Sequence, residues 1–224
     1  MQRVIARELM DDPPDSLIEL EANLADIEFA NARFGGAAPV LREVRRADAR
    51  NVLDVGCGSA DIPLALVREA ATRGVQLAVT ALDHSEDMLA IARRRTGGHP
   101  QLHFVRGEGQ TLPFEAASFD VVTCNLALHH FEPEAARALL AEMKRVARVT
   151  AIVCDLRRSR TAYVAALAWS RLFTRNRLSR HDGPLSVRRA YTPLEAHGLA
   201  RAAGWRAPRV RREAFFRMTI VEGT

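Results

Sequence analysis

The sequence predicts an α/β protein with a mostly parallel sheet and helices on both of its faces. Short apolar segments typical of buried strands alternate along the chain with segments of helical periodicity. The first strand ends in a glycine turn, Gly56-Cys57-Gly58, that leads directly into a helix. Strands that alternate with helices form parallel sheets covered on both sides. We therefore expect a seven-stranded sheet with an antiparallel hairpin at its C-terminal edge.

The expected elements follow from this alternation. Ser16 or Asp15 would cap the first helix, and Gly35-Gly36 would end it. An arginine-rich loop that contains Gly183-Pro184 is expected before the last helix. The predicted strands cover residues 51–55, 75–82, 102–105, 119–124, 150–154, 206–211 and 214–221. The predicted helices cover residues 17–31, 62–72, 85–95, 133–148, 161–173 and 193–203.

The 224 residues fit one domain with a single substantial core. We divide this domain, residues 1–224, into four parts. They are an N-terminal helical cap (1–45), a cofactor-binding core (50–155), a helical lid or substrate insert (157–191), and a C-terminal helix with the hairpin (192–224).

Composition indicates a soluble globular protein, because 48% of the residues are hydrophobic and 26% are charged. No signal-peptide pattern follows Met1, and the apolar stretch 163–169 is too short to span a bilayer. We therefore expect a cytoplasmic protein. Three widely spaced cysteines form no disulfide or zinc pattern, so we expect reduced thiols and no metal.

Charge is unevenly distributed along the chain. Residues 157–224 contain 15 arginines against four acidic residues. Such a region either forms a solvated surface or attracts an anionic partner such as nucleic acid or acidic lipid. Both interpretations stay open at this point.

The glycine turn and its neighbours indicate the class of ligand. The turn lacks the Gly-Lys-Ser or Gly-Lys-Thr of a phosphate-binding loop, and Asp61 stands where a dinucleotide site has its third glycine. Asp54 and Asp61 would be poor neighbours for a pyrophosphate, whereas they suit a ligand that carries a cation. S-adenosylmethionine has a sulfonium, an ammonium and no phosphate.

The second strand ends at Asp83. A carboxylate at this position can accept two hydrogen bonds from ribose hydroxyls. Asp83 or Ser85 can equally cap the helix that follows. The end of this strand can both bind the ribose and cap the helix.

Four segments in order resemble motifs of the class I S-adenosylmethionine-dependent methyltransferases, which have a Rossmann-like fold. They are Val52-Leu53-Asp54-Val55-Gly56-Cys57-Gly58, Ala81-Leu82-Asp83-His84-Ser85-Glu86-Asp87-Met88-Leu89, the run from Phe104 to Phe114, and the run from Ser118 to Phe131. The resemblance implies S-adenosylmethionine as cofactor, S-adenosylhomocysteine as product, and cofactor contacts at Asp54, Gly56, Cys57, Gly58, Asp61, Asp83, His84, Met88, Glu108, Gly109 and Asn125. Ala60 replaces a frequent third glycine, at some loss of backbone freedom.

The residues after the fourth predicted strand narrow the class of molecule that could accept the methyl group. Asn125-Leu126 lacks the Pro-Pro that follows Asn or Asp in many nucleic-acid amino methyltransferases. Within the family, Gly58-Ser59-Ala60-Asp61-Ile62 resembles the quinone-biosynthesis enzymes, although His129-His130 replaces their usual Arg-Asn. The runs 31–36 and 181–186 resemble small methyltransferases of polyketide-type gene neighbourhoods.

We therefore expect a phenolic, quinone-like or polyketide acceptor, with O-methylation favoured over C-methylation. Modification of nucleic acid or protein through the arginine-rich C-terminal region is the second hypothesis. A third is a relative that transfers no methyl group, either a binding module or an enzyme that uses the cofactor fold for other chemistry. Peripheral membrane association with a lipophilic substrate, and a monomer or a homodimer, are both left open.

Methyl transfer from a sulfonium requires alignment of the reactants above all, and a base that removes a phenol's proton would help further. Histidine is the natural candidate near neutral pH. His129 and His130 follow the fourth strand, where the cofactor's methyl should lie. His181 and Tyr191 flank the expected lid and complete the set of catalytic candidates.

Overall fold

In the computed structural model, residues 1–12 and 16–223 are described, and they contain one seven-stranded sheet with the order β3-β2-β1-β4-β5-β7-β6. Five neighbouring strands are parallel, whereas β7 is antiparallel to both β5 and β6. The strands are β1 (Asn51–Val55), β2 (Ala78–Asp83), β3 (Leu102–Arg106), β4 (Phe119–Asn125), β5 (Ala147–Leu156), β6 (Arg209–Arg212) and β7 (Arg217–Val221). The predicted fold class is confirmed, including the antiparallel C-terminal hairpin.

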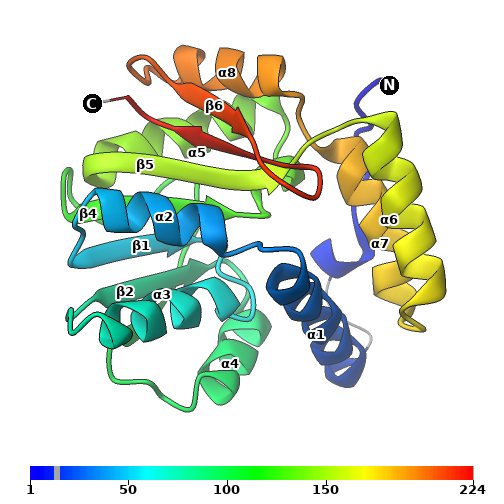
Figure 1. Ribbon diagram of the computed structural model, residues 1–224, viewed down its shortest axis with the longest axis horizontal. Helices are drawn as coiled ribbons and strands as arrows, with labels where there is room; N and C mark the ends of the chain where they lie inside the picture. Colours follow the sequence, from blue (N-terminus) through cyan, green and yellow to red (C-terminus); the bar gives the residue numbers. More distant parts are fainter. Residues whose placement is uncertain (13–15, 224) are drawn as a thin grey trace.

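Two hydrophobic clusters fill the two faces of this sheet. Because side chains alternate along a strand, Val52 packs into one cluster and Leu53 into the other. The helices α2 (Ala38–Arg46) and α3 (Asp61–Thr72) cover one face. The helices α5 (Pro133–Val146) and α8 (Pro193–Ala202) cover the opposite face (Figure 1). The helix α4 (Glu86–Arg95) packs beside β2 and β3.

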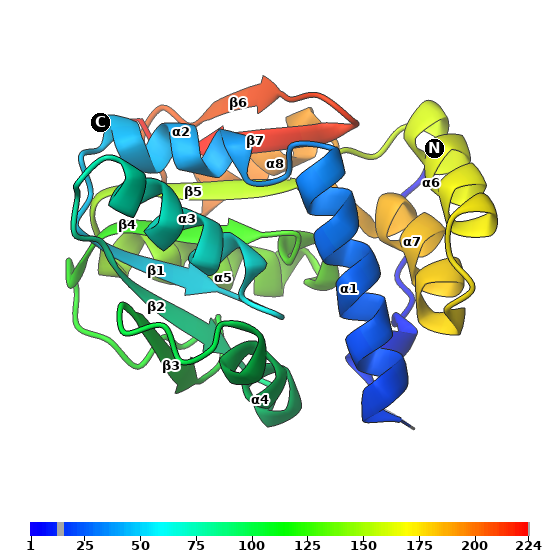
Figure 2. The same cartoon turned by 60° about the horizontal axis from the view of Figure 1, so that its bottom comes forward.

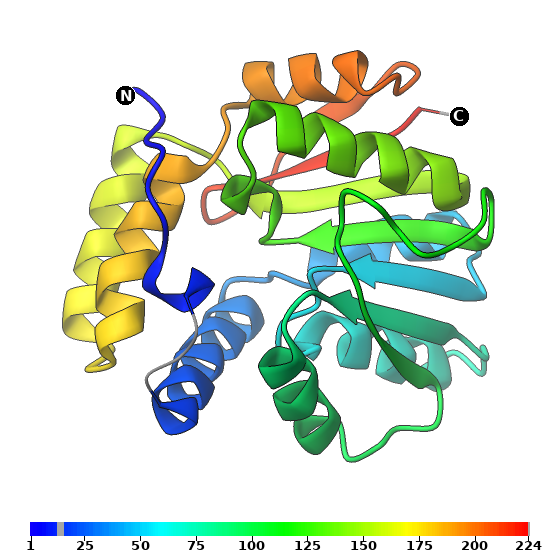
Figure 3. The same cartoon turned by 180° about the vertical axis from the view of Figure 1, so that it is seen from behind.

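Three further helices and the N-terminal segment lie together at the side of the sheet where the parallel strands end (Figure 2). They are α1 (Leu17–Arg33), α6 (Arg160–Leu172) and α7 (Arg177–Arg189), of which α7 contacts both others. We call residues 1–12 the N-terminal strap, because they run along α7 (Figure 3) and contain the 3₁₀ turn η1 (Leu9–Asp11). Ser16 caps α1 by accepting the amide of Glu19, whereas Asp15 lies outside the described residues.

The expected loop around Gly183-Pro184 is wrong, because both residues lie inside α7. Asn176 caps this helix by accepting the amide of Ser179, and Asp182 is buried where it accepts amides from the strap. These tertiary contacts outweigh the unfavourable local propensity of a glycine-proline pair in a helix.

The short helix α2 had no counterpart among the predicted elements. It is only nine residues long, and four of these are charged, which leaves too short an apolar pattern to predict a helix. Val40 and Val44 are nevertheless buried against the sheet, and Pro39 stands in its first turn. Among the described residues, none of the helices has both the length and the apolar character needed to cross a bilayer.

The start of β1 is fixed by a side chain from β4. Asp120 Oδ2 accepts the amides of Arg50 and Asn51 at 2.8 and 3.0 Å, and Arg148 pairs with its other oxygen. Burial favours the neutral acid, but these bonds lower the pKa of Asp120 below its ordinary value. The carboxylate therefore holds two adjacent strands in register at their amino ends.

We predict that Asp120→Ala lowers the free energy of unfolding by about 1–3 kcal/mol, because two strand amides lose their acceptor. Urea unfolding at pH 7 measures the change. The exposed Glu115→Ala is the control and should stay within about 0.5 kcal/mol of wild type. An Asp120→Ala protein as stable as this control would contradict the assigned role.

Candidate active site

The strand order places a topological switch between β1 and β4. From β1 the chain proceeds outward to β2 and β3 on one side, and β4 and β5 follow on the other. Ligands of open α/β sheets bind beyond the carboxyl ends of the strands at such a point. We call the residues at these ends the strand-end site. They are Asp54, Gly56, Gly58, Asp83, His84, Glu108 and Asn125.

The glycine turn is tied to the end of the neighbouring strand. The amides of Gly56 and Cys57 both donate to the carbonyl of Leu82, at 2.8 and 3.0 Å. Gly56 has φ +73°, and a Cβ atom there would lie 2.9 Å from the Cβ of Ala127. Gly58 has φ +51° and donates its amide to Asp83 Oδ2 at 3.0 Å. Both positions therefore favour glycine.

Ala60 stands where the family often has a third glycine, and its backbone is strained as the replacement predicts. It adopts a left-handed conformation, with φ 59° and ψ 30°, directly before α3. Left-handed backbone costs an alanine about 1–2 kcal/mol relative to the right-handed form. Leu126, which follows β4, also has a positive φ of 49°. Strained residues of this kind occur preferentially at functional sites.

A buried carboxylate lies beneath the turn. Asp54 Oδ1 accepts the hydroxyl of Thr123 at 2.5 Å and the side-chain amide of Asn125 at 2.7 Å. Burial raises the pKa of Asp54 to about 7, although these two hydrogen bonds favour the ionised form. Asn125 Oδ1 is buried, and no group among the described residues donates a hydrogen bond to it. Asp54 and Asn125 thus present acceptor atoms to which a hydrogen-bond donor or a cation can bind.

The second acidic position is at the end of β2. Asp83 Oδ1 accepts the amide of Ser85 at 3.0 Å, and Ser85 in turn caps α4. His84 is largely exposed, and its pKa is raised by its hydrogen bond to Asp83 and by the nearby charges of Glu108 and Asp11. Asp83, His84 and Glu108 thus lie close enough to interact, and their contacts with the cofactor stay predictions.

Asp61 connects the strand-end site to α1. Its Oδ2 accepts the side-chain amide of Asn31 at 2.8 Å, and Asn31 Oδ1 accepts Arg217 at 2.7 Å. Burial raises the pKa of Asp61 in spite of the bond from Asn31. The end of α1 is thereby held beside the start of α3.

Three of the predicted cofactor residues are used in packing. The thiol of Cys57 is buried with Leu89, and burial raises its pKa well above the ordinary value. Met88 packs into a small apolar cluster that includes Leu20 of α1. A Cβ on Gly109 would lie 2.9 Å from Leu139 Cδ1, so this glycine is required for space. Cofactor contacts for these three residues stay predictions.

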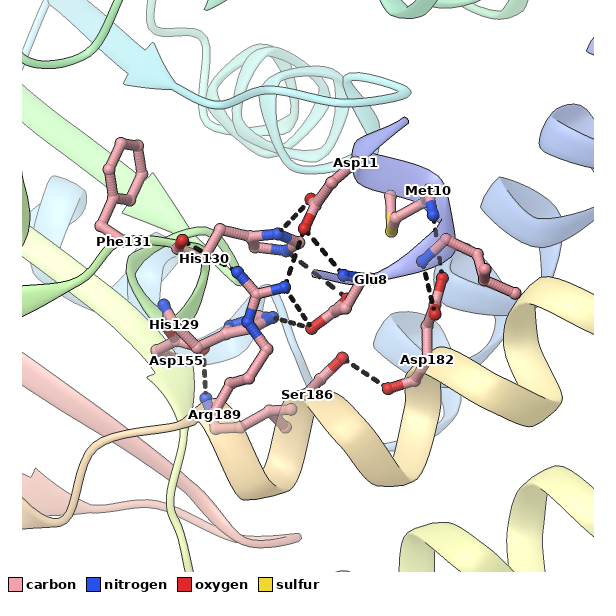
Figure 4. A network of polar contacts seen from close by, with 12 residues as sticks. Glu8, Met10, Asp11, His129, His130, Phe131, Asp155, Asp182, Ser186 and Arg189 are labelled. Carbon is pink, nitrogen blue, oxygen red and sulfur yellow. Dashed lines mark hydrogen bonds and ion pairs between the residues drawn. The ribbon is translucent and has the colours of Figure 1, made fainter. Parts of the chain in front are cut away.

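The two adjacent histidines lie in the 3₁₀ turn η2 (Leu128–His130), directly after β4. His129 is buried, with Nδ1 2.7 Å from Asp155 Oδ1 at the end of β5. His130 is more accessible, with 22% of its side chain exposed, and its Nδ1 lies 2.7 Å from Asp11 Oδ1. Each imidazole is thus oriented by its own carboxylate (Figure 4).

The acids around the histidines differ in charge state. Burial opposes ionisation of Asp11 and Asp155, but hydrogen bonds and charge from the histidines lower the pKa of both. Burial raises the pKa of Glu8 to about 7, although the charges of His130 and Arg189 act against this. We call Glu8, Asp11, His129, His130, Asp155 and Arg189 the histidine cluster.

His181 and Tyr191 have hydrogen-bond partners other than the two histidine rings. His181 pairs with Asp182 at 2.7 Å and lines a cavity of about 610 Å³ with Tyr163 and several arginines. Tyr191 is buried, donates its hydroxyl to the carbonyl of Phe131 at 2.8 Å, and has its pKa raised by burial to about 12. Their catalytic roles stay predictions, and the structure gives Tyr191 a structural partner.

Sequence reasoning missed the strap. Arg3 donates to the carbonyls of Arg189 and Phe131, at 2.6 and 2.8 Å, and so fixes residues 1–12 beside η2. This contact and the amides of the strap that Asp182 accepts together place Glu8 and Asp11 beside the histidines. The acidic pair in an otherwise ordinary N-terminal segment is a weak signal, and nothing local in the sequence connects it to residues more than 100 positions away.

Comparison with known proteins matches residues 52–150 to the family described as methyltransferase domain. A demethylmenaquinone methyltransferase of Staphylococcus haemolyticus is 35% identical over 120 residues, which cover 54% of this chain and 48% of that protein. The corresponding Staphylococcus epidermidis enzyme is 37% identical over 107 residues, which cover 48% and 42%. The chain thus aligns with about half the length of these curated relatives.

Solved structures extend the similarity of the fold to nearly the whole chain. An S-adenosylmethionine-dependent methyltransferase from Aquifex aeolicus superposes with a TM-score of 0.65 and 18% identity, covering 90% of this chain and 96% of that one. PigF with S-adenosylhomocysteine gives 0.66 and 21%, covering 98% and 63%. The strand order, the glycine turn and these matches agree: residues 52–150 form a class I S-adenosylmethionine-dependent methyltransferase domain, within a chain that has the fold of that family.

Proposed function

We propose that the protein transfers a methyl group from S-adenosylmethionine to a phenolic, quinone-like or polyketide small molecule, with transfer to oxygen favoured. The observation that carries this proposal is the polar arrangement under the glycine turn. Asp54, Asn125 and Asp83 offer only acceptor atoms toward an incoming ligand, which suits a cationic nucleoside and not a pyrophosphate.

The strand-end residues fit the cofactor in chemical type. Asp54 and the unpaired Asn125 Oδ1 would hold the cationic amino-acid end. Asp83 has two amide donors, but each carboxylate oxygen accepts further bonds, so ribose hydroxyls can still bind. Glu108 is exposed beside His84 and would face the adenine amino group.

The cofactor supplies the methyl group and a good leaving group, so the protein's task is alignment and proton removal. Among the four catalytic candidates, His130 is favoured as the base. Its Nδ1 faces the ionised Asp11, which leaves the Nε2 lone pair to accept a proton. The acceptor would lie between His130 and the strand-end site, because η2, which contains His130, follows the strand β4 that ends at Asn125.

We predict that Asp83→Ala weakens S-adenosylmethionine binding about 5- to 150-fold, which corresponds to a loss of about 1–3 kcal/mol. The ribose bonds are lost, and Gly58 loses its acceptor. Isothermal titration calorimetry measures the affinity, with the exposed Asp87→Ala as control. An unchanged affinity in Asp83→Ala would refute this role.

We predict that S-adenosylmethionine affinity rises several-fold, on the order of fivefold, between pH 6 and pH 7.5. The pKa of Asp54 is raised to about 7, so its carboxylate becomes available to the cationic ligand as the pH rises through this range. Calorimetry at several pH values measures the slope. In Asp54→Asn the affinity should be lower and nearly independent of pH, and an equal slope in both proteins would count against Asp54 as the source.

The proposed reaction is tested with labelled S-adenosylmethionine and a panel of phenols and quinols, with mass spectrometry to locate the methyl group. We expect methylation of a phenolic oxygen. His130→Ala should lower turnover about 10²-fold, the lower end of general-base effects, with cofactor affinity nearly intact. The exposed His103→Ala is the control. Equal turnover in His130→Ala and wild type would remove His130 from the mechanism.

A further inference from the structure

The histidine cluster brings together three side chains of metal-ligating type. Glu8 comes from the strap, and His129 and His130 come from η2. One ligand atom from each lies within 4.8 Å of the other two. His129 Nε2 is 3.7 Å from Glu8 Oε1, and His130 Nε2 is 3.8 Å from Glu8 Oε2 (Figure 4). The two imidazoles therefore face one carboxylate.

A second layer of carboxylates orients both imidazoles. Asp155 and Asp11 each lie 2.7 Å from the Nδ1 atom of one histidine. When each acid accepts an Nδ1–H, the Nε2 lone pair of the same ring is directed at Glu8. Histidines that bind metals are oriented in this way, with the second ring nitrogen hydrogen-bonded to a carboxylate or carbonyl.

Glu8 is the residue that points to a ligand. Its side chain is 1% exposed, and its Oε1 has no hydrogen-bond donor within residues 1–12 and 16–223. A buried carboxylate oxygen without a donor is costly. A cation between Glu8 and the imidazoles would satisfy this oxygen.

Charge balance leads to the same conclusion. The cluster holds the carboxyl groups of Glu8, Asp11 and Asp155. The guanidinium of Arg189 lies 2.7 Å from Asp11 and 3.6 Å from Glu8. With ionised acids and neutral imidazoles, these four charges sum to two negative charges. Either two protons or one divalent cation would neutralise them.

We propose that Glu8, His129 and His130 form a binding site for a divalent transition-metal ion, for which zinc is the natural probe. Two imidazoles and one carboxylate are a common zinc ligand set that leaves a fourth position open. Zinc bonds of about 2.1 Å in a tetrahedron separate ligand atoms by about 3.4 Å. The two spacings between a histidine and Glu8, 3.7 and 3.8 Å, therefore need only a small contraction, and all three ligand atoms already lie within 4.8 Å of one another. The partly exposed His130 marks the open side.

This site goes beyond the proposed methyl transfer and stands on geometry of its own. Zinc on His130 Nε2 would occupy the lone pair that the free base uses. In the loaded form the ion would act as a Lewis acid: it would lower the pKa of a phenol bound at the open position, and the phenol's proton would pass to solvent water.

The test is calorimetric titration of zinc into the chelator-treated 224-residue chain, with cobalt(II) absorption as a second readout of coordination. We expect one equivalent to bind with a dissociation constant of about 1 µM or below. Glu8→Gln keeps the side chain's size but removes the charged ligand, and should weaken binding at least about tenfold. Glu134→Gln, an exposed position on α5, is the matched control and should bind as wild type does.

The absence of saturable binding to the wild-type chain, or equal affinity in Glu8→Gln and wild type, would overturn the proposal. Circular dichroism checks that each variant is folded. If Glu8→Gln does not fold, His130→Gln, at a partly exposed position, provides the same comparison. Zinc binding is measured without methyl transfer. The titration therefore tests the metal site even if the proposed reaction is not observed.

Discussion

The burial of Asp54 between strands is the constraint on which the site depends. An ionised carboxylate in such a position needs donors or a cation around it. The pairing of β1 with β4 places Thr123 directly opposite Asp54, and Asn125 follows on the same face two residues later. These two side chains supply hydrogen bonds but no positive charge. We therefore propose that a cationic ligand completes the arrangement.

Much of the fold and half of the site could be predicted from the sequence, because Asp54 and its neighbours form a local sequence pattern. The residues from Asn51 to Gly58 combine a buried strand, an acid and a glycine turn within eight positions. Local features of this kind determine local geometry, because parallel strands bring their carboxyl ends to one edge. Asp83 follows β2 in the same way, and its bond to Gly58 joins the two predicted positions. The left-handed Ala60 likewise agrees with its place in the glycine pattern.

The other half of the site depends on contacts between distant segments. The strap, α7 and η2 meet through Arg3, Asp182 and Arg189, which bind backbone atoms far from them in the sequence. Such contacts leave no periodic signal, so Glu8 and Asp11 carried no prediction and Gly183-Pro184 was assigned to a loop. The histidines were predicted from their place after β4, but their partners Asp155 and Asp11 are visible only in the structure.

The most direct measurement compares the affinities of S-adenosylmethionine, NAD and ATP for the unmodified protein under one set of conditions. A site built around buried acceptors and acids predicts saturable binding of S-adenosylmethionine and no measurable binding of the two phosphate-bearing ligands. Tighter binding of NAD or ATP than of S-adenosylmethionine would contradict the claim that Asp54 and Asp83 select a cationic nucleoside.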